Sequence, residues 1–292
     1  MMNRILLILV FSLTLCNSMA QMPETSIYLI SYTNKGKEFK AVDIKQISNG
    51  IGYNNQPSFS QDCNTIYFTS NVSDSLQTDL FAYDLVKRQS QRLSNLNLSE
   101  YSPMTRPGFS KGLSHVRVEE DKKQHLRFYD IDYTSSLNLV PCSDSVGYYV
   151  WSDSNNLGLI ILNNGLEFHT YSLGDSNTKL ISKNVGRFIS FDKKTNNYLF
   201  LTKDSASTGI NYHNIKSGLI QKRIPAMTSC EDYAIDVNSD LYGGHDGKLF
   251  RYSNTNWVQV ADFTEKIGSF YRMSFCNCGK HLCVVSFKGK RP

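Results

Sequence analysis

Short runs of alternating hydrophobic and polar residues follow one another along most of the chain, and each is typical of a β-strand with one buried face. The clearest group lies at residues 56–93, QPSFSQDCNTIYFTSNVSDSLQTDLFAYDLVKRQSQRL. It predicts two middle strands at residues 65–70 and 79–84 and an outer strand at residues 90–94. Four short apolar runs within about 40 residues indicate a four-stranded propeller blade.

Two sets of marker residues repeat this unit along the chain. The apolar residue expected to end each first strand advances by 50, 42, 40, 44 and 40 residues, along Phe59, Phe109, Trp151, Phe191, Ile235 and Phe275. A marker in each third strand advances by 46, 42, 42 and 39 residues, along Tyr83, Tyr129, Tyr171, His213 and Tyr252. Because two independent markers keep nearly the same period, the sequence predicts an all-β fold, a six-bladed β-propeller of four-stranded blades.

The later repeats supply the remaining strands by the same alternation. We expect them at residues 113–119, 126–131, 137–140, 157–162, 167–172, 178–182, 198–202, 210–215, 219–224, 240–244, 248–253 and 257–261. A tight hairpin turn is expected at His245-Asp246-Gly247, with glycine where a positive φ is needed.

The last blade combines strands from both ends of the chain. Residues 270–275 and 281–287 supply two strands, and residues 26–32 and 39–48 supply the other two. Such a closure leaves no free sheet edge at the joint. In a competing arrangement, residues 27–31 pair instead with residues 65–70. Either way, we expect a single domain over residues 24–288.

The first twenty residues have the features of a secretory signal peptide. Arg4 precedes an apolar run, and Ser18-Met19-Ala20 provides a cleavage site of small residues after Ala20. The apolar run of eleven residues is shorter than the roughly 20 needed for a membrane span. A lipoprotein modified at Cys16 is the alternative, although Leu15 directly before the cysteine fits that processing less well. We therefore expect a periplasmic or extracellular protein with no transmembrane segment.

Charge and cysteine content limit the partners and the chemistry. The expected mature chain has 30 basic and 26 acidic residues, and its net charge of +4 does not favour nucleic acid. Residues 289–292 continue a basic tail that we expect to be solvated. The even number of cysteines in the mature chain predicts at least one disulfide, with the pairing left open among Cys63, Cys142, Cys230, Cys276, Cys278 and Cys283. A metal site is not expected, because a second cysteine pair at zinc-site spacing is missing.

The repeat motifs resemble those of the TolB-type propeller. Asn55-Gln-Pro-Ser-Phe-Ser-Gln-Asp62 is similar to the Pro-x-Phe-Ser-Pro-Asp-Gly turn of that family. The segments at residues 79–85 and 91–94 resemble its Asp-Ile-Tyr-x-x-Asp-Leu and Arg-Leu-Thr segments, and residues 275–280 occupy the same turn in the last repeat. Cys63 and Cys278 depart from the family's turn glycine and aspartate. Without room for TolB's N-terminal α/β domain, the chain looks most like stand-alone secreted propellers of the Bacteroidetes type, which implies an envelope or extracellular location and no assigned chemistry.

Candidate catalytic residues do not form a recognisable constellation. Ser110 lies in a Gly-x-Ser-x-Gly pattern, but a nucleophile elbow needs a following helix, and Ser110 here precedes a hairpin turn. The six histidines show no metal-ligand spacing, and they are His115, His125, His169, His213, His245 and His281. We expect His213 to pack in the place that a tyrosine has in other repeats. Calcium binding by acidic groups at residues 119–121 and at Asp130 and Asp132 remains open.

These observations predict a general function, but they do not identify the residues that carry it. We expect a non-enzymatic binding or scaffold propeller, without a cofactor and monomeric, whose central funnel engages an envelope or extracellular protein, a peptide or a glycan. The alternative is a propeller hydrolase or lyase, with an active site of histidine and acidic residues assembled in the funnel from different blades.

Overall fold

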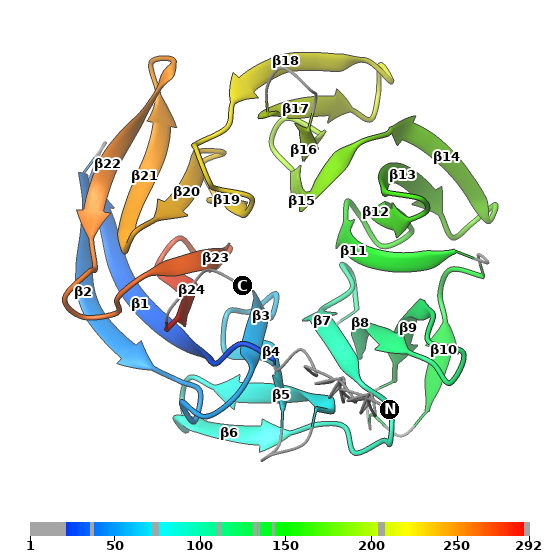
Figure 1. Ribbon diagram of the computed structural model, residues 1–292, viewed down its shortest axis with the longest axis horizontal. Helices are drawn as coiled ribbons and strands as arrows, with labels where there is room; N and C mark the ends of the chain where they lie inside the picture. The colour runs from blue at the N-terminus through cyan, green and yellow to red at the C-terminus, as the bar shows by residue number, and fades with distance from the viewer. Residues whose placement is uncertain are drawn as a thin grey trace, which may run out of the picture.

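The computed structural model of the protein describes residues 22–288 apart from residues 36–37, 72–75, 110–111, 131–132, 134, 142–143 and 204–207. Within these residues the chain has no helix and forms twenty-four strands in six four-stranded antiparallel sheets. The sheets are arranged as blades around a central axis (Figure 1). The predicted six-bladed β-propeller is confirmed. The expected signal peptide with Cys16, the tail at residues 289–292, and Ser110, Asp132 and Cys142 all lie outside the described residues.

Each blade is numbered here by chain order, and its strands are given from the innermost to the outermost. Blades 1 and 2 consist of β3 (Asn54–Phe59), β4 (Thr65–Asn71), β5 (Thr78–Asp84), β6 (Gln89–Arg92) and of β7 (Glu100–Met104), β8 (Leu113–Val118), β9 (Gln124–Tyr129), β10 (Ser136–Asn138). Blades 3 and 4 consist of β11 (Ser145–Trp151), β12 (Asn156–Leu162), β13 (Leu166–Ser172), β14 (Asn177–Ser182) and of β15 (Val185–Asp192), β16 (Asn197–Lys203), β17 (Thr208–Asn214), β18 (Ile220–Pro225). Blades 5 and 6 consist of β19 (Tyr233–Ile235), β20 (Leu241–His245), β21 (Lys248–Ser253), β22 (Asn256–Asp262) and of β23 (Phe270–Phe275), β24 (His281–Phe287), β1 (Thr25–Lys35), β2 (Glu38–Gln46).

Blade 6 closes the ring with strands from both ends of the described chain, as predicted. Strand β1 pairs with β24 from Thr25 opposite Phe287 to Ser31 opposite His281, and with β2 on its other side. The competing arrangement, in which β1 pairs with β4, is wrong, because both edges of β1 are already occupied. The Thr25 amide also donates to the Gly52 carbonyl, so the closing blade is tied to the chain that leads into blade 1.

One predicted strand end is wrong. Phe109 does not end the first strand of blade 2, because β7 ends five residues earlier at Met104. Pro107 and Gly108 follow in a turn in which Gly108 has φ +79, a value that favours glycine. Phe109 is therefore outside the sheet, where its ring lies 4.2 Å from the Arg106 guanidinium carbon. The other five markers end their first strands or lie within one residue of the end.

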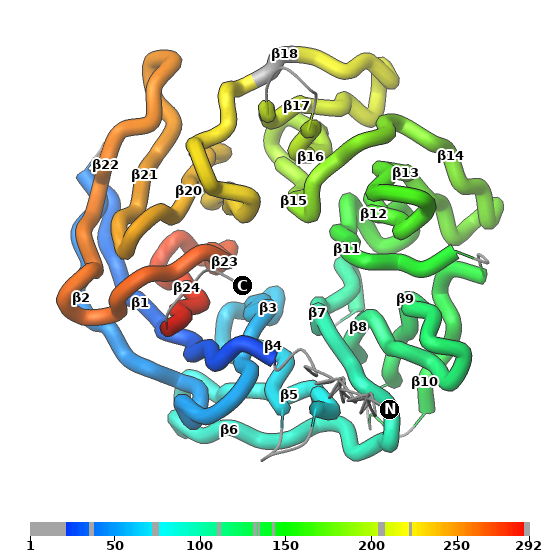
Figure 2. Tube along the Cα trace, in the orientation of Figure 1, coloured from blue at the N-terminus to red at the C-terminus, as the bar shows by residue number. Residues whose placement is uncertain are grey.

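The hydrophobic core is divided among the contacts between blades. In the described chain, buried hydrophobic side chains form six clusters, and each contains residues of two neighbouring blades. Ile160 and Phe168 of blade 3, for example, pack with Val185, Tyr198 and Phe200 of blade 4. The tube in Figure 2 shows the same order, with each blade facing the next around the ring. This arrangement explains why the sequence period is that of a blade, since every blade must bury both faces.

The third-strand markers are part of these contacts. Tyr83, Tyr129 and Tyr171 are all less than 5% exposed. The predicted packing role of His213 is also confirmed, because it is 5% exposed and its ring stacks on that of Tyr198 at 6.5 Å between centroids. The same position in four blades thus fills the same space between sheets.

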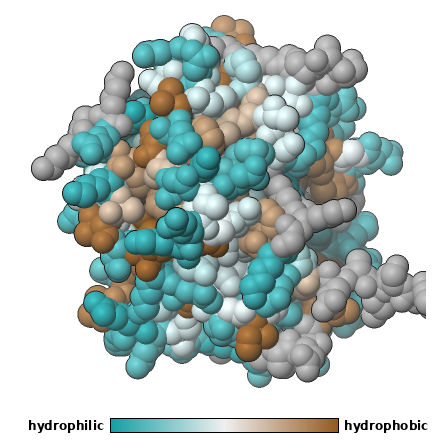
Figure 3. Space-filling model, turned by 60° about the vertical axis from the view of Figure 1, so that its left-hand side comes forward, coloured by the Kyte–Doolittle hydropathy of each residue, from teal (hydrophilic) through white to brown (hydrophobic). Residues whose placement is uncertain are grey.

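The blade turns and the outer strands follow simpler rules. Asp246 and Gly247 form the predicted hairpin turn between β20 and β21, and both have positive φ, as a two-residue turn of type I′ requires. Outer strands are largely exposed, and Figure 3 shows hydrophilic and hydrophobic residues interspersed on the face that includes blade 6.

No helix long and apolar enough to cross a membrane occurs in the part of the chain described.

Candidate functional site: the charged end of the central channel

The innermost strands of all six blades surround a central channel. Its cavity has a volume of about 340 Å³ and is lined by residues of β3, β7, β11, β15, β19 and β23 and of the segments next to them. In Figure 1 these strands lie closest to the central axis. Concave sites where several elements converge are where propellers and other folds bind ligands. The channel is therefore the candidate functional site.

Irregular pairing in the first strands determines which side chains reach the channel. In every first strand except the short β19, the register with the second strand shifts, and the shifts lie at Asn55/Ser58, Tyr101/Met104, Val146/Tyr148, Val185/Ile189 and Phe270/Arg272. A bulge leaves a residue without a cross-strand partner and turns its side chain in a new direction. Tyr148, Arg187 and Arg272 lie at or inside these shifts, and all three line the cavity.

Two arginines share one aspartate where the first strands begin. The Arg187 Nη2 atom lies 3.0 Å from Asp232 Oδ2, and the Arg272 Nε atom lies 3.4 Å from Asp232 Oδ1. The three side chains are between 9% and 21% exposed. Burial by itself would lower the pKa of Arg272, but Asp232 together with Tyr271, Tyr53 and Tyr148 more than offsets it and holds that pKa above its ordinary value. Arg272 is therefore charged at every relevant pH.

A second carboxylate extends this ionic network to the edge of the channel. Glu231 lies 2.5 Å from the Lys203 Nζ atom and 3.7 Å from the Arg187 Nε atom. The longer distance exceeds a hydrogen bond. The Arg187 Nε atom is nevertheless buried and has no hydrogen-bond partner in the described part of the protein. Arg187 thus retains donor capacity that its protein neighbours do not use.

Aromatic and amide groups fix the second arginine. Arg272 donates from Nη1 to the Asn55 side-chain oxygen at 2.9 Å, and Asn55 in turn donates to the Tyr271 hydroxyl. The Tyr271 ring lies 5.6 Å from the Arg272 guanidinium carbon and 5.8 Å from that of Arg187. Burial raises the pKa of Tyr271 and of Tyr53, so both phenols are neutral near pH 7. Neutral amide and aromatic groups therefore surround Arg272 in addition to the carboxylate of Asp232.

The opposite end of the channel is built from the turns between first and second strands. Gln61, Lys193 and Asn277 line the cavity there, together with the apolar side chains of Trp151 and Phe275. Among the described residues that line the whole cavity, the basic ones outnumber the acidic ones, with Arg187, Lys193 and Arg272 against Asp232. The cavity therefore favours a ligand with negative charge.

The histidines are dispersed through the blades. No histidine belongs to the described lining of the channel. His115 is buried beside Glu100, with 3.0 Å between Nε2 and Oε1, and His169 lies 3.1 Å from Glu167. His245 lies beside Asp246 on the surface of blade 5. The cluster of histidine and acidic residues that the hydrolase or lyase alternative requires is not assembled by the described residues of this cavity.

Two of the acidic residues considered for calcium, Glu119 and Asp121, have other partners. Glu119 Oε1 accepts hydrogen bonds from Arg117 at 2.9 and 3.0 Å, and Arg127 approaches it at 3.5 Å. Asp121 accepts the backbone amide of Lys123. Two arginines thus already compensate the charge of Glu119, which makes it a poor cation ligand.

The three charged residues at the charged end of the channel, Arg187, Asp232 and Arg272, were not identified from the sequence. Arg187 and Arg272 occur inside apolar strands, where a period-two pattern predicts a buried hydrophobic side chain. The available signal is positional, because Arg187, Asp232 and Arg272 each precede the first-strand marker of their blade by three or four residues. Charged residues at one equivalent position in three successive blades indicate a shared site on the axis.

Comparisons with known proteins give the fold. No protein-family model and no curated protein sequence matches the chain. Among solved structures, it is similar to a putative TolB from Agrobacterium tumefaciens, with a TM-score of 0.70 and 8% identity over 92% of this chain and 99% of that one. It also resembles TolB from Acinetobacter baumannii, with a TM-score of 0.61 and 9% identity over 91% of this chain, and it spans 65% of that chain's length. A gluconolactonase from Xanthomonas campestris is similar at a TM-score of 0.62 and 9% identity, over 88% of this chain and 94% of that one.

These similarities show a TolB-like propeller fold and leave the function open. Identities this low carry information about the fold alone, and the same fold occurs in the gluconolactonase. The resemblance to TolB-type repeats is therefore confirmed at the level of the fold. Membership of the Bacteroidetes secreted type stays a prediction.

Proposed function

We propose that the protein is an exported, non-enzymatic binding propeller, a monomeric single domain that acts in the cell envelope or outside the cell. The charged end of its channel engages a carboxylate of a partner protein or peptide. The observation that carries this proposal is the pairing of Arg187 and Arg272 with a single aspartate, Asp232, inside a cavity with an excess of basic residues.

The chemistry of the two arginines favours a carboxylate. A guanidinium carries five N–H donors in a planar fork that matches the two oxygens of a carboxylate. Arg187 holds Asp232 through Nη2, while its Nε atom is buried without a hydrogen bond. Both arginine side chains are partly exposed and line the cavity, so an incoming carboxylate can approach them without breaking the existing ion pair. Val150 and Ile189 line the cavity as well and provide apolar contact for the rest of a peptide.

The same geometry argues against hydrolysis or elimination as the main activity. General acid–base catalysis needs a group that changes protonation near the working pH, most often histidine or a carboxyl with a raised pKa. The described channel offers arginines, which stay protonated, and one carboxylate, which is held between two of them. The gluconolactonase of similar fold does not alter this argument, because that likeness concerns the fold alone.

The proposal is tested by selection and turnover measured in parallel. Random linear peptides displayed on phage are selected on the immobilised protein, and lactone, peptide and glycan substrates are assayed for turnover. We expect selected peptides to contain Asp or Glu, and we expect binding to weaken when these residues are changed to Asn or Gln. Turnover of any of the substrates that disappears in an Asp232→Asn variant would contradict the proposal.

A further inference from the structure

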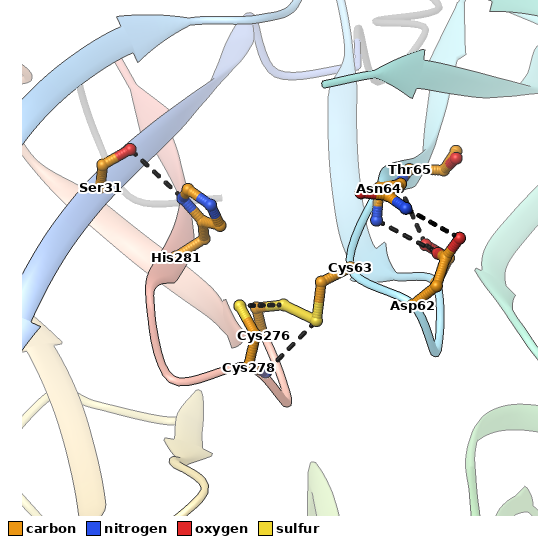
Figure 4. The surroundings of a disulfide bond; sticks show 9 residues. Ser31, Asp62, Cys63, Asn64, Thr65, Cys276, Cys278 and His281 are labelled. Carbon is orange, nitrogen blue, oxygen red and sulfur yellow. Dashed lines mark hydrogen bonds between the residues drawn. A yellow bond between two sulfur atoms is a disulfide. The ribbon is translucent and has the colours of Figure 1, made fainter. Parts of the chain in front are cut away.

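Three cysteines from two blades meet at the end of the channel that is formed by turns. Cys63 lies in the turn between β3 and β4, and Cys276 and Cys278 lie in the turn between β23 and β24 (Figure 4). The three Sγ atoms all lie within 4.8 Å of one another. Cys63 and Cys276 are joined as a disulfide, with 6.2 Å between their Cα atoms, whereas Cys278 is free and exposed.

The free sulfur is in contact with the disulfide. The Cys278 Sγ atom lies 3.1 Å from Cys276 Sγ, and the Cys278 amide donates to Cys63 Sγ at 3.2 Å. The side chain of Cys278 therefore contacts the Cys276 sulfur of the disulfide, and the backbone amide of Cys278 contacts the Cys63 sulfur.

Two tight turns hold this arrangement in place. Cys63 has a φ of +61, and its amide donates to the Ser60 carbonyl at 3.1 Å. In the other turn, Gly279 has a φ of +68, and its amide donates to the Cys276 carbonyl at 3.0 Å. Both turns are fixed by backbone hydrogen bonds and by residues in the left-handed region. The cysteines are thus presented by the ordinary hairpins of blades 1 and 6.

We infer that Cys278 is the reactive thiol of a three-cysteine exchange centre at the joint between blades 1 and 6. The Cys278 thiolate attacks Cys276 Sγ, so that a Cys276–Cys278 bond forms and the Cys63–Cys276 bond breaks. Cys63 leaves as a thiolate and takes up a proton, equivalent to the one that Cys278 lost. The disulfide moves from between two blades into one turn, and no external oxidant or reductant is consumed.

The solvent exposure of each cysteine determines where a thiol or disulfide from solution can react. Cys276 is only 1% exposed, whereas Cys278 is open to solvent. A small thiol in solution therefore meets the centre at Cys278 once the disulfide has moved there, and reduces the exposed Cys276–Cys278 bond. In the reverse direction, all three cysteines begin as thiols. Cys278 attacks an external disulfide and releases one external thiol, and Cys276 then attacks Cys278 Sγ and releases the second. Cys63 finally attacks Cys276 Sγ, so that the Cys63–Cys276 bond forms and Cys278 becomes a free thiol again. Cys278 is the entry point through which the disulfide between the blades is formed and broken.

The other cysteines in the described chain do not take part in this exchange. Cys230 is buried in the contact between blades 4 and 5, with its Sγ atom 3.3 Å from the Asp232 carbonyl oxygen. Cys283 is buried within β24, and burial raises the pKa of its thiol. A protonated, inaccessible thiol is a poor nucleophile. Cys278 is thus the described cysteine that combines exposure with contact to a disulfide.

The first test follows the position of the disulfide without added reductant. The native protein is incubated with N-ethylmaleimide, quenched in acid and mapped by peptide mass spectrometry. We expect label on Cys278 in one population and on Cys63, with a Cys276–Cys278 pair, in a second. In a Cys278→Ser variant, Cys63 should remain unlabelled, and an Asn277→Ser control should behave as wild type. Label confined to Cys278 in the wild type at all times would overturn the inference.

The second test measures reduction by glutathione. The Cys63–Cys276 bond of the Cys278→Ser variant should be lost at least about tenfold more slowly than that of the wild type, because a neighbouring thiol acts at a high effective concentration. Equal rates would overturn the inference. A Cys63→Ser variant provides a second check, since oxidised glutathione should convert its Cys276 and Cys278 thiols to a Cys276–Cys278 disulfide and be reduced to two glutathione thiols. If that variant instead retains two free thiols, or if the wild type as isolated holds one zinc ion on three thiolates, the exchange centre is rejected.

Discussion

The two ends of the channel are built by different means. At the turn end, the hairpins between first and second strands place sulfur atoms of blades 1 and 6 in contact. At the charged end, bulges in the first strands direct two arginines onto one aspartate. Turn residues have fixed positions in a repeat, whereas a bulge changes which side chain faces the axis. The difference shows that a regular repeat can hold a specific site where its pairing is irregular.

The largest effect is expected at the turn end. Replacing Cys63 by serine removes the covalent link between blades 1 and 6, which closes a loop of 213 residues. We expect the free energy of unfolding to fall by up to about 5 kcal/mol, because the unfolded chain regains the entropy of an open loop. Urea unfolding of the oxidised variant and wild type measures the change. Equal stability of the two proteins would show that the disulfide does not constrain the ring.

A smaller loss is expected at the charged end. Replacing Asp232 by asparagine leaves Arg187 and Arg272 facing each other without the carboxylate between them. Removing one partner from a largely buried charge network typically costs about 3 kcal/mol. Asp246→Asn is the matched control, because its carboxylate is 79% exposed and lies beside His245 in a surface turn. If the two substitutions have the same effect on urea unfolding, the charged end is not a coupled network.

The two ends should also differ in their response to pH. Burial, with a smaller contribution from Lys280, lowers the pKa of His281, which begins β24 and contacts Ser31 at 3.2 Å (Figure 4). The unfolded chain therefore binds more protons than the folded protein just below the unfolded pKa of about 6.5. Stability is complete above that pH and declines as the pH falls toward the lower pKa of the folded state.

Substitution shows how much of this slope comes from His281, next to the turn that carries Cys276 and Cys278. His281→Gln removes a group that titrates in this range and should make unfolding less dependent on pH between 7.5 and 5.5. Arg187→Gln should leave the slope unchanged, since arginine does not titrate there. Thermal unfolding across this range measures both variants. A slope lost in Arg187→Gln and retained in His281→Gln would reverse the assignment.

Much of the fold could be predicted because blade packing imposes a period on the sequence. The markers Tyr83 and Tyr171 fill equivalent spaces between blades, and alternation along β1 and β24 indicated how the ring closes. Phe109 was misplaced because an aromatic residue after a Pro-Gly turn has the same local pattern as a strand end. Tyr83 and Tyr171 are buried whereas Phe109 is exposed, so the same local pattern led to two different structures.

The charged end could not be predicted with the same rules. Arg187 and Arg272 occupy strand positions that alternation assigns to hydrophobic residues, and only the register shifts in β15 and β23 turn them toward the axis. The contact of Cys63 with Cys278 was equally hidden, because the two are 215 residues apart in the sequence. Sites formed between blades depend on how the blades are arranged around the ring, and the sequence of a single repeat does not specify that arrangement.

The smallest effect is expected on peptide binding, and measuring it provides the most direct test of the proposed function. An acidic peptide obtained by selection is labelled, and its affinity for wild type, Arg187→Gln and Lys193→Gln is measured by fluorescence anisotropy. Losing a hydrogen bond to a charged group costs about 1.5 to 3 kcal/mol, so Arg187→Gln should weaken binding at least about tenfold. Lys193→Gln, at the opposite end, should change it less than about twofold. If Lys193→Gln abolishes binding while Arg187→Gln leaves it intact, the charged end is not the binding site.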